Sequence, residues 1–228
     1  ATSNQVIDFG NLTLGRKITG NTITGNTGHG IVSILTKYMQ FQAQLGGNTI
    51  SANGGFGWFT RANRDATVNV EFGNTLLTNT SNTLFAHHDA GVGFDLTDDV
   101  TGQILMNNVT ATNTVNGSDA AFNGEGIKVK IARRVLLSAV IVDRATVSGN
   151  ISNGIAVEMV ESTRIANLTI SNSNIFGNLN GVSLNRTGPA DLFAILDHND
   201  IHNNTADGLN VFVTNRKTAI LEFDLFDN

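Results

Sequence analysis

The chain has 228 residues, of which 40% are apolar, and 14 basic against 19 acidic side chains give a net charge of −5. This mildly acidic balance argues against nucleic acid or an anionic membrane as a partner, and no apolar run reaches the ~18 residues of a membrane span. The absence of cysteine excludes a disulfide framework and a thiolate metal site, and it leaves the redox compartment open.

A six-residue pattern recurs along the chain. In order it reads NTITGN, NTISAN, NTLLTN, NVTATN, ATVSGN, SNIFGN and NDIHNN, at intervals of 27, 26, 34, 37, 28 and 26 residues. The third residue is apolar in every copy except the fourth, where it is Thr110. The sixth residue is always asparagine, at Asn26, Asn53, Asn79, Asn113, Asn150, Asn178 and Asn204.

Each period also contains about three short stretches with the alternating pattern of β-strands. A glycine follows the sixth-position asparagine, and an alternating strand such as GIAVEMV follows the glycine. Helical periodicity is absent, and the stretches are separated by Asn, Gly and Asp turns. Such a unit buries its apolar face only by stacking on copies of itself. The pattern therefore predicts an all-β, single-domain solenoid of about seven to eight coils over residues 1–228.

These repeats resemble the right-handed parallel β-helix family, the superfold of pectate lyases. The likeness covers the whole chain and is greatest to the non-catalytic repeat regions of bacterial surface and secreted proteins, so it implies an extracellular or cell-surface location. A shared superfold specifies architecture and leaves function open.

The asparagine column has a physical explanation. A tight turn leaves backbone N–H and C=O groups without ladder partners, and an asparagine side chain offers both a donor and an acceptor to them. Stacked at the ~4.8 Å spacing of strands, the amides of successive coils can bond to one another. We therefore interpret the seven asparagines as a structural ladder inside one corner.

The strand after the glycine predicts two ion pairs on the outer surface. Its alternation points every second residue outward, which places Asp95 beside Lys128 and Lys130 beside Glu158. Opposite charges on adjacent strands contribute roughly 0.2–1 kcal/mol each. A lysine on this face could also act as the base of a lyase, but its acidic neighbours favour the ion-pair interpretation.

The tripeptide Gly-His-Gly at 28–30 matches a motif of polygalacturonases. Those enzymes place an N-T-D stretch and two adjacent aspartates before the motif and R-I-K after it. Here Asp98-Asp99 follows His29, the Arg-Ile at 164–165 is followed by alanine, and N-T-D is absent. Because glycoside hydrolysis needs carboxylates at a set separation, we interpret the match as a feature of a glycine-rich turn.

Two longer segments interrupt the repeat. The gap from asparagine to glycine is usually four residues, but it is 14 in the third coil and 13 in the fourth. We expect these two loops, residues 80–92 and 114–125, to leave the same corner of adjacent coils and to touch. Histidine and carboxylate side chains gathered there could bind a metal ion, with Ca²⁺ as one option, or a sugar. The candidate residues are His87, His88, Asp89, Asp119 and Glu125.

The same loops also have a purely structural interpretation, in which Leu84, Phe85 and Phe122 pack as a lid over the corner. Two functions follow from these alternatives. The first is a non-catalytic structural or adhesive β-helix segment of an extracellular or surface protein, without a cofactor. The second is a polysaccharide-binding or polysaccharide-cleaving enzyme with its site near the two loops.

The last stretch, AILEFDLFDN, repeats the start of a coil. A terminal coil without a polar cap leaves unpaired strand edges and an open apolar core. We therefore expect the chain to be a segment of a longer β-helix, or its open ends to be covered by flanking coils or another protein chain.

Overall fold

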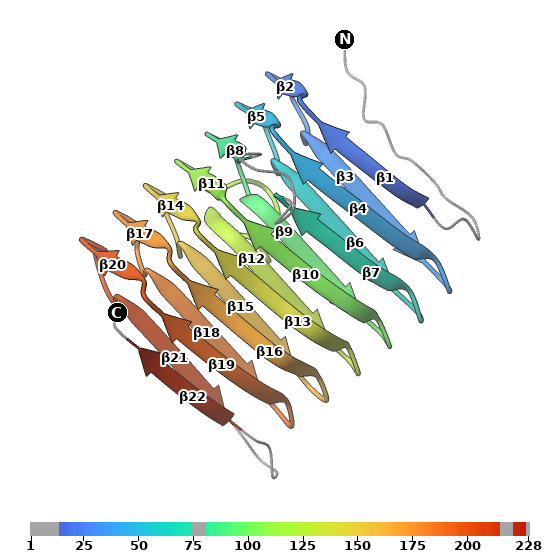
Figure 1. The fold of residues 1–228 in the computed structure, drawn as a ribbon, viewed down its shortest axis with the longest axis vertical. Coiled ribbons are helices and arrows are strands. Elements are labelled where there is room, and N and C mark those ends of the chain that lie inside the picture. The colour runs from blue at the N-terminus through green and yellow to red at the C-terminus, as the bar shows by residue number, and fades with distance from the viewer. Residues whose placement is uncertain (1–13, 74–80, 215–220, 227–228) are drawn as a thin grey trace.

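The computed structural model describes residues 14–73, 81–214 and 221–226, and its strands form three parallel sheets with no helix in these ranges. Each turn of the chain adds one strand to each sheet in the same order, so successive coils stack along one axis (Figure 1). The fold is the parallel β-helix that the repeats predict.

The first sheet has eight strands and the other two have seven each. The first contains β1 (Leu14–Thr19), β4 (Gln40–Gly46), β7 (Thr67–Phe72), β10 (Thr101–Asn107), β13 (Leu136–Asp143), β16 (Arg164–Ser171), β19 (Asp191–Asp197) and β22 (Leu221–Phe226). The second contains the short strands β2 (Thr22–Thr24), β5 (Thr49–Ser51), β8 (Asn82–Phe85), β11 (Val109–Thr112), β14 (Thr146–Ser148), β17 (Asn174–Phe176) and β20 (Asp200–His202). The third contains β3 (Ile31–Thr36), β6 (Trp58–Asn63), β9 (Ala90–Thr97), β12 (Glu125–Ala132), β15 (Ile155–Val160), β18 (Val182–Thr187) and β21 (Leu209–Thr214).

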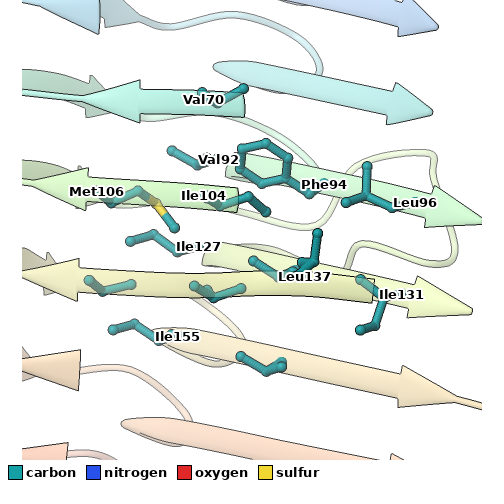
Figure 2. Close-up of a cluster of buried hydrophobic side chains, with 14 of the residues drawn as sticks. Val70, Val92, Phe94, Leu96, Ile104, Met106, Ile127, Ile131, Leu137 and Ile155 are labelled. Atoms are coloured by element: carbon teal, nitrogen blue, oxygen red, sulfur yellow. The ribbon is translucent and has the colours of Figure 1, made fainter. Parts of the chain in front are cut away.

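Alternate residues of all three sheets point into one continuous core. Strand β18 shows the pattern clearly, since Val182 and Leu184 are buried and Ser183 and Asn185 are less so. Figure 2 shows this core in the middle coils, where Phe94 of the third sheet packs among aliphatic side chains such as Ile104 of the first. Burial of stacked apolar side chains is the main force that holds the coils together.

The chain turns at three corners through left-handed backbone conformations. Between the second and third sheets, one residue per coil has a φ between 50° and 68°, and these residues are Gly25, Ala52, Ala86, Asn113, Gly149, Gly177 and Asn203. Between the third and first sheets, two consecutive residues do so in several coils, as at Asp98-Asp99 and Arg133-Arg134. Glycine adopts this conformation without strain, while other L-residues pay roughly 1–2 kcal/mol.

Candidate functional site

The predicted asparagine ladder is present in five of the seven coils. Asn26 Nδ2 donates to Asn53 Oδ1 at 2.9 Å, and Asn150 Nδ2 donates to Asn178 Oδ1 at 2.9 Å. The chain continues to Asn204, whose Oδ1 accepts from Asn178 Nδ2 at 3.2 Å. Amides also donate to the backbone of the preceding coil, as Asn178 does to the carbonyl of Val147 at 3.1 Å. The ladder therefore supplies hydrogen-bond partners to the backbone groups of the corner, in the way that the sequence predicts.

The third and fourth coils differ from the prediction. Strand β8 pairs with β5 so that Leu84 stands beside Ile50, and this register puts His87 at the ladder position. The predicted residue of that coil, Asn79, lies outside the described residues. The repeat of this coil is thus NTLFAH, which ends in histidine. The stretch NTLLTN, eight residues earlier, matches the pattern better, and the prediction therefore chose Asn79.

In the fourth coil the ladder position belongs to Thr114, and the prediction of Asn113 was wrong by one residue. Ala111 pairs with Leu84 and with Val147, and the Thr114 N–H donates to Asn150 Oδ1 at 3.0 Å. Asn113 is exposed and has a φ of 56°. It fills the left-handed position just before the ladder, which asparagine tolerates better than most residues.

A second ladder, which the sequence analysis missed, lines the other end of the short sheet. Asn21 Nδ2 donates to Asn48 Oδ1 at 3.0 Å, and Asn48 Nδ2 donates to Asn82 Oδ1 at 2.9 Å. Further along, Asn199 Oδ1 accepts from the N–H of Ser173 at 3.1 Å. The signal for it was the asparagine that often begins the six-residue pattern.

His87 is fully buried and occupies its ladder position as a substitute for an amide. Its Nε2 lies 2.9 Å from the carbonyl oxygen of Ile50, one coil back, so the neutral ring donates there. Its Nδ1 has no hydrogen-bond partner among the described residues, and neither do Asn53 Nδ2 and Thr114 Oγ1 in the adjacent rungs. Burial lowers the pKa of His87 to about 4. The ring is therefore neutral and enclosed at neutral pH.

As predicted, the two segments touch at one corner, where the chain passes from the second sheet to the third. His88 and Val115 form a parallel β-bridge, and the Gly124 N–H donates to the carbonyl of Asp89 at 2.7 Å. However, the segment 81–92 contains the ordinary strand β8, and its repeat glycine is Gly91, because β9 pairs with β12 from Ala90 opposite Glu125 onward. At this corner the described residues have one insertion, the loop 114–125.

The inserted loop folds over the outside of the third sheet and packs an aromatic cluster there. Phe122 is fully buried, with its ring centroid 4.9 Å from that of Phe56 and 5.6 Å from that of Phe59. Gly93 lies beneath these rings, and a Cβ there would come within 2.9 Å of Phe56 and 3.2 Å of Phe122. The lid interpretation is thus correct for Phe122, whereas Leu84 lies in the central core and Phe85 is exposed.

The carboxylates Asp89 and Asp119 hold the loop in place. Asp89 is buried and its Oδ1 accepts from the Asp119 N–H at 2.9 Å, while Asp119 Oδ1 accepts from the Ala121 N–H at 3.0 Å. His88, by contrast, is exposed, and its Nδ1 lies 3.3 Å from the carbonyl oxygen of Asn116. These contacts are of the kind that shape a loop.

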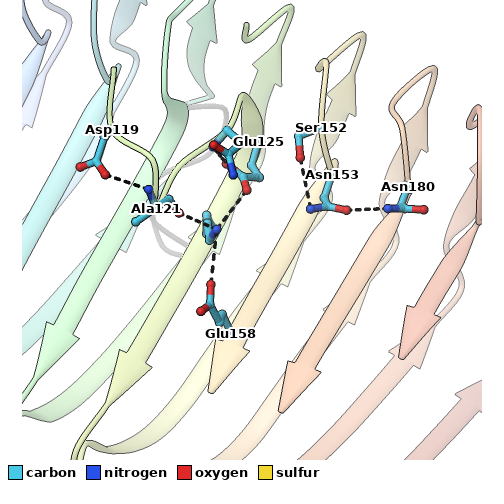
Figure 3. Close-up of polar contacts among 9 residues, drawn as sticks. Asp119, Ala121, Glu125, Ser152, Asn153, Glu158 and Asn180 are labelled. Atoms are coloured by element: carbon cyan, nitrogen blue, oxygen red, sulfur yellow. Dashed lines mark hydrogen bonds and ion pairs between the residues drawn. The ribbon is translucent and has the colours of Figure 1, made fainter. Parts of the chain in front are cut away.

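Glu125 is buried and paired with Lys128. Lys128 Nζ lies 3.1 Å from Glu125 Oε1, 3.4 Å from Glu158 Oε2 and 2.6 Å from the carbonyl of Ala121 (Figure 3). The Asn123 N–H donates to Glu125 Oε2 at 2.7 Å. Lys128, one of the two lysines on this face that could have served as a lyase base, is therefore enclosed by two carboxylates and a loop carbonyl.

The outer-face register was correct for one pair and wrong for the other. Lys130 stands beside Glu158 on the neighbouring strand, as predicted, but the ion pair of Glu158 is formed with Lys128, at 3.4 Å. Asp95 stands beside Lys130 rather than Lys128, which is opposite Gly93, and Asp95 forms its ion pair with Arg61 at 3.0 Å. The difference follows from the repeat glycine of the third coil being Gly91.

The residues of the polygalacturonase-like match are also in structural roles. The Nδ1 of His29 accepts from the Phe56 N–H at 3.0 Å, and burial lowers the pKa of His29. Asp98 and Asp99 form ion pairs with Arg133 at 2.7 Å and Arg134 at 2.6 Å, one coil further on. The hydrogen bonds from Arg134 lower the pKa of Asp99. The tandem aspartates are thus neutralised by tandem arginines.

Within the described residues, no three His, Cys, Asp or Glu side chains are grouped so that they could hold a metal ion. The same residues include no helix long and apolar enough to span a membrane. A scan against models of protein families found no match, and neither the curated proteins nor the solved structures gave one.

Proposed function

We propose that the chain is a non-catalytic β-helix with a structural or adhesive role, outside the cell or on its surface. The proposal is supported by the contacts of the titratable side chains at the lid corner, which is the corner between the second and third sheets that carries the loop 114–125. His87 fills a ladder rung, Asp89 and Asp119 accept from loop N–H groups, and Glu125 pairs with Lys128. A catalytic acid or base has to reach a substrate, and these four side chains are occupied with their own chain.

A screen for binding and cleavage of polysaccharides, with and without Ca²⁺, tests this proposal. We expect no cleavage under either condition. Cleavage that disappears when His88 and Asp119 are replaced by alanine would establish the alternative, an enzyme with its site at the lid corner. Arg133 follows β12, whereas the loop 114–125 precedes that strand, so the two lie at different corners of the coil. Arg133→Ala therefore serves as the control variant, and it should leave any such activity unchanged.

The proposal also includes a partner that covers the last described coil. In β21 and β22 the inward positions Val211, Val213 and Leu225 are 41%, 38% and 56% exposed, whereas their counterparts in the preceding coil are buried. Apolar side chains left open in this way favour a covering layer. We propose that β-helical coils, of this chain or of another, pack there. Native mass spectrometry and hydrogen exchange of β21 would detect such a layer.

A further inference from the structure

A charged side chain lies within the apolar core of the solenoid. Arg186 follows Val182 and Leu184 at the third inward position of β18, and it is only 2% exposed. It pairs with Met159 in the preceding coil and with Val213 in the next, so both of its neighbours along the stack are apolar. A buried guanidinium that lacks a counter-charge is strongly unfavourable.

No described residue supplies that counter-charge. Arg186 Nε and Nη2 are both buried without a hydrogen-bond partner. The buried carboxylates of the described residues, Asp89 and Glu125, belong to the lid corner, where they already have partners. Arginine keeps its proton under all ordinary conditions. The positive charge must therefore be balanced by a group other than these side chains.

The two unpaired atoms lie on one edge of the guanidinium plane, and this edge binds two oxygens at once. Arg134 of the same protein demonstrates the arrangement. Its Nε donates to Asp99 Oδ1 at 2.7 Å and its Nη2 to Asp99 Oδ2 at 2.6 Å. The corresponding edge of Arg186 is thus suited to a carboxylate or another small oxyanion.

A hydroxyl at the corner between the third and first sheets, which directly follows Arg186 in the chain, adds a further polar atom. Thr163 is buried, its Oγ1 has no partner, and its carbonyl accepts from the Asp191 N–H at 2.9 Å. Because Arg164 pairs with Asp191, Thr163 stands opposite Ala190, just across the turn from Arg186. Two inward-facing side chains of adjacent coils, one cationic and one a hydroxyl, therefore have unused donors at one corner.

We propose that Arg186 and Thr163 form an internal binding site for a small oxyanion of the carboxylate class. The anion accepts both N–H groups of the guanidinium edge and the hydroxyl of Thr163, and it balances the buried charge. The site is separate from the lid corner and does not depend on the proposed function.

Thermal unfolding in formate and in chloride tests the site. The purified chain is dialysed into a cationic buffer, and sodium formate is titrated against sodium chloride at matched ionic strength. We expect the unfolding midpoint to rise by about 3–6 °C in formate, with saturation, because a ligand that binds only the folded state stabilises it. Arg186→Met, which copies the residue at this position in the preceding coil, should remove the difference between the two salts. Arg164→Met, at an exposed arginine of β16, should retain it.

Three results would overturn the proposal. The first is an equal midpoint of the wild-type chain in both salts, and the second is an undiminished formate effect in Arg186→Met. If Arg186→Met does not fold, Arg186→Lys replaces it, because an ammonium keeps the charge but loses the two-pronged edge. An undiminished formate effect in the lysine variant is the third result. A reduced effect in Thr163→Val would support the role of the hydroxyl.

Discussion

His87 Nε2 lies 2.9 Å from the carbonyl oxygen of Ile50, in the same type of contact that Asn150 Nδ2 makes with Ala111 at 3.2 Å. A histidine thus stands in a ladder of amides and reproduces one of their two functions. The acceptor function is incomplete, since Nδ1 has no partner among the described residues. Protonation of Nδ1 would place a charge in this enclosed position, where no described residue accepts a hydrogen bond from it.

The first prediction concerns stability in mild acid. Burial in the folded chain lowers the pKa of His87 to about 4, from the ordinary value of 6.5 that applies in the unfolded chain. The unfolded chain therefore binds the proton first as the pH falls, and stability is lost between about pH 6.5 and pH 4. At about 1.4 kcal/mol per unit, the loss reaches about 3 kcal/mol. His29, whose pKa is also lowered, adds to it in the same direction.

Urea unfolding at pH 7.5, 6.0 and 4.5 would measure this loss. The window lies above the range in which Asp99 titrates, because the pKa of that carboxyl is lowered from 3.8. A free energy of unfolding that stays constant across the three pH values would contradict the enclosed position of His87.

The second prediction concerns the lid. Phe122→Ala removes a fully buried ring that packs against Phe56 and Phe59, and large-to-small changes of this kind cost about 3–5 kcal/mol. Hydrogen exchange should accelerate in the loop 114–125, while the amides of β17 keep their protection. Phe85→Ala is the matched control, since this ring is 44% exposed. Equal effects of the two substitutions would show that the loop is not anchored by its aromatic ring.

The third prediction concerns the left-handed corner. Ala52 has a φ of 50° at the position where other coils carry Gly25 or Gly149. Ala52→Gly should stabilise the chain by about 1 kcal/mol, because glycine adopts this conformation without strain. Ala132→Gly, at the end of strand β12, should destabilise it by about 0.5–1 kcal/mol. A loss of stability in both variants would argue against the backbone conformation of the corner.

The architecture was predictable because one pattern repeats. The six-residue motif and its glycine recur in most coils, and together they indicate three strands, a corner ladder and stacking into a solenoid. The outer-face pair Lys130 and Glu158 followed from the same periodicity. These features depend on the average of many coils, so a misalignment in one coil does not affect them.

The candidate site was harder to predict because it lies in the coils that depart from the average. His87 and Thr114 hold ladder positions without being asparagines, and Asn113 lies one residue before its ladder position, where the backbone is left-handed. In these two coils the six-residue pattern therefore matched the wrong residues. That mismatch made an ordinary strand, β8, resemble part of a loop. Arg186 gave no signal either, because alternation alone places it inward without indicating a counter-charge.

The claim that the candidate residues build the fold is tested most directly by His87→Asn, measured by urea unfolding from pH 7.5 to pH 4.5. An asparagine restores the amide that the other rungs use, with an acceptor for Asn53 and a donor for Ile50. We expect the variant to be as stable as the wild type at pH 7.5, or about 1 kcal/mol more stable, and to lose most of the decline between pH 6.5 and pH 4, leaving the part that His29 contributes. A destabilised variant that keeps this decline would contradict the ladder role of His87.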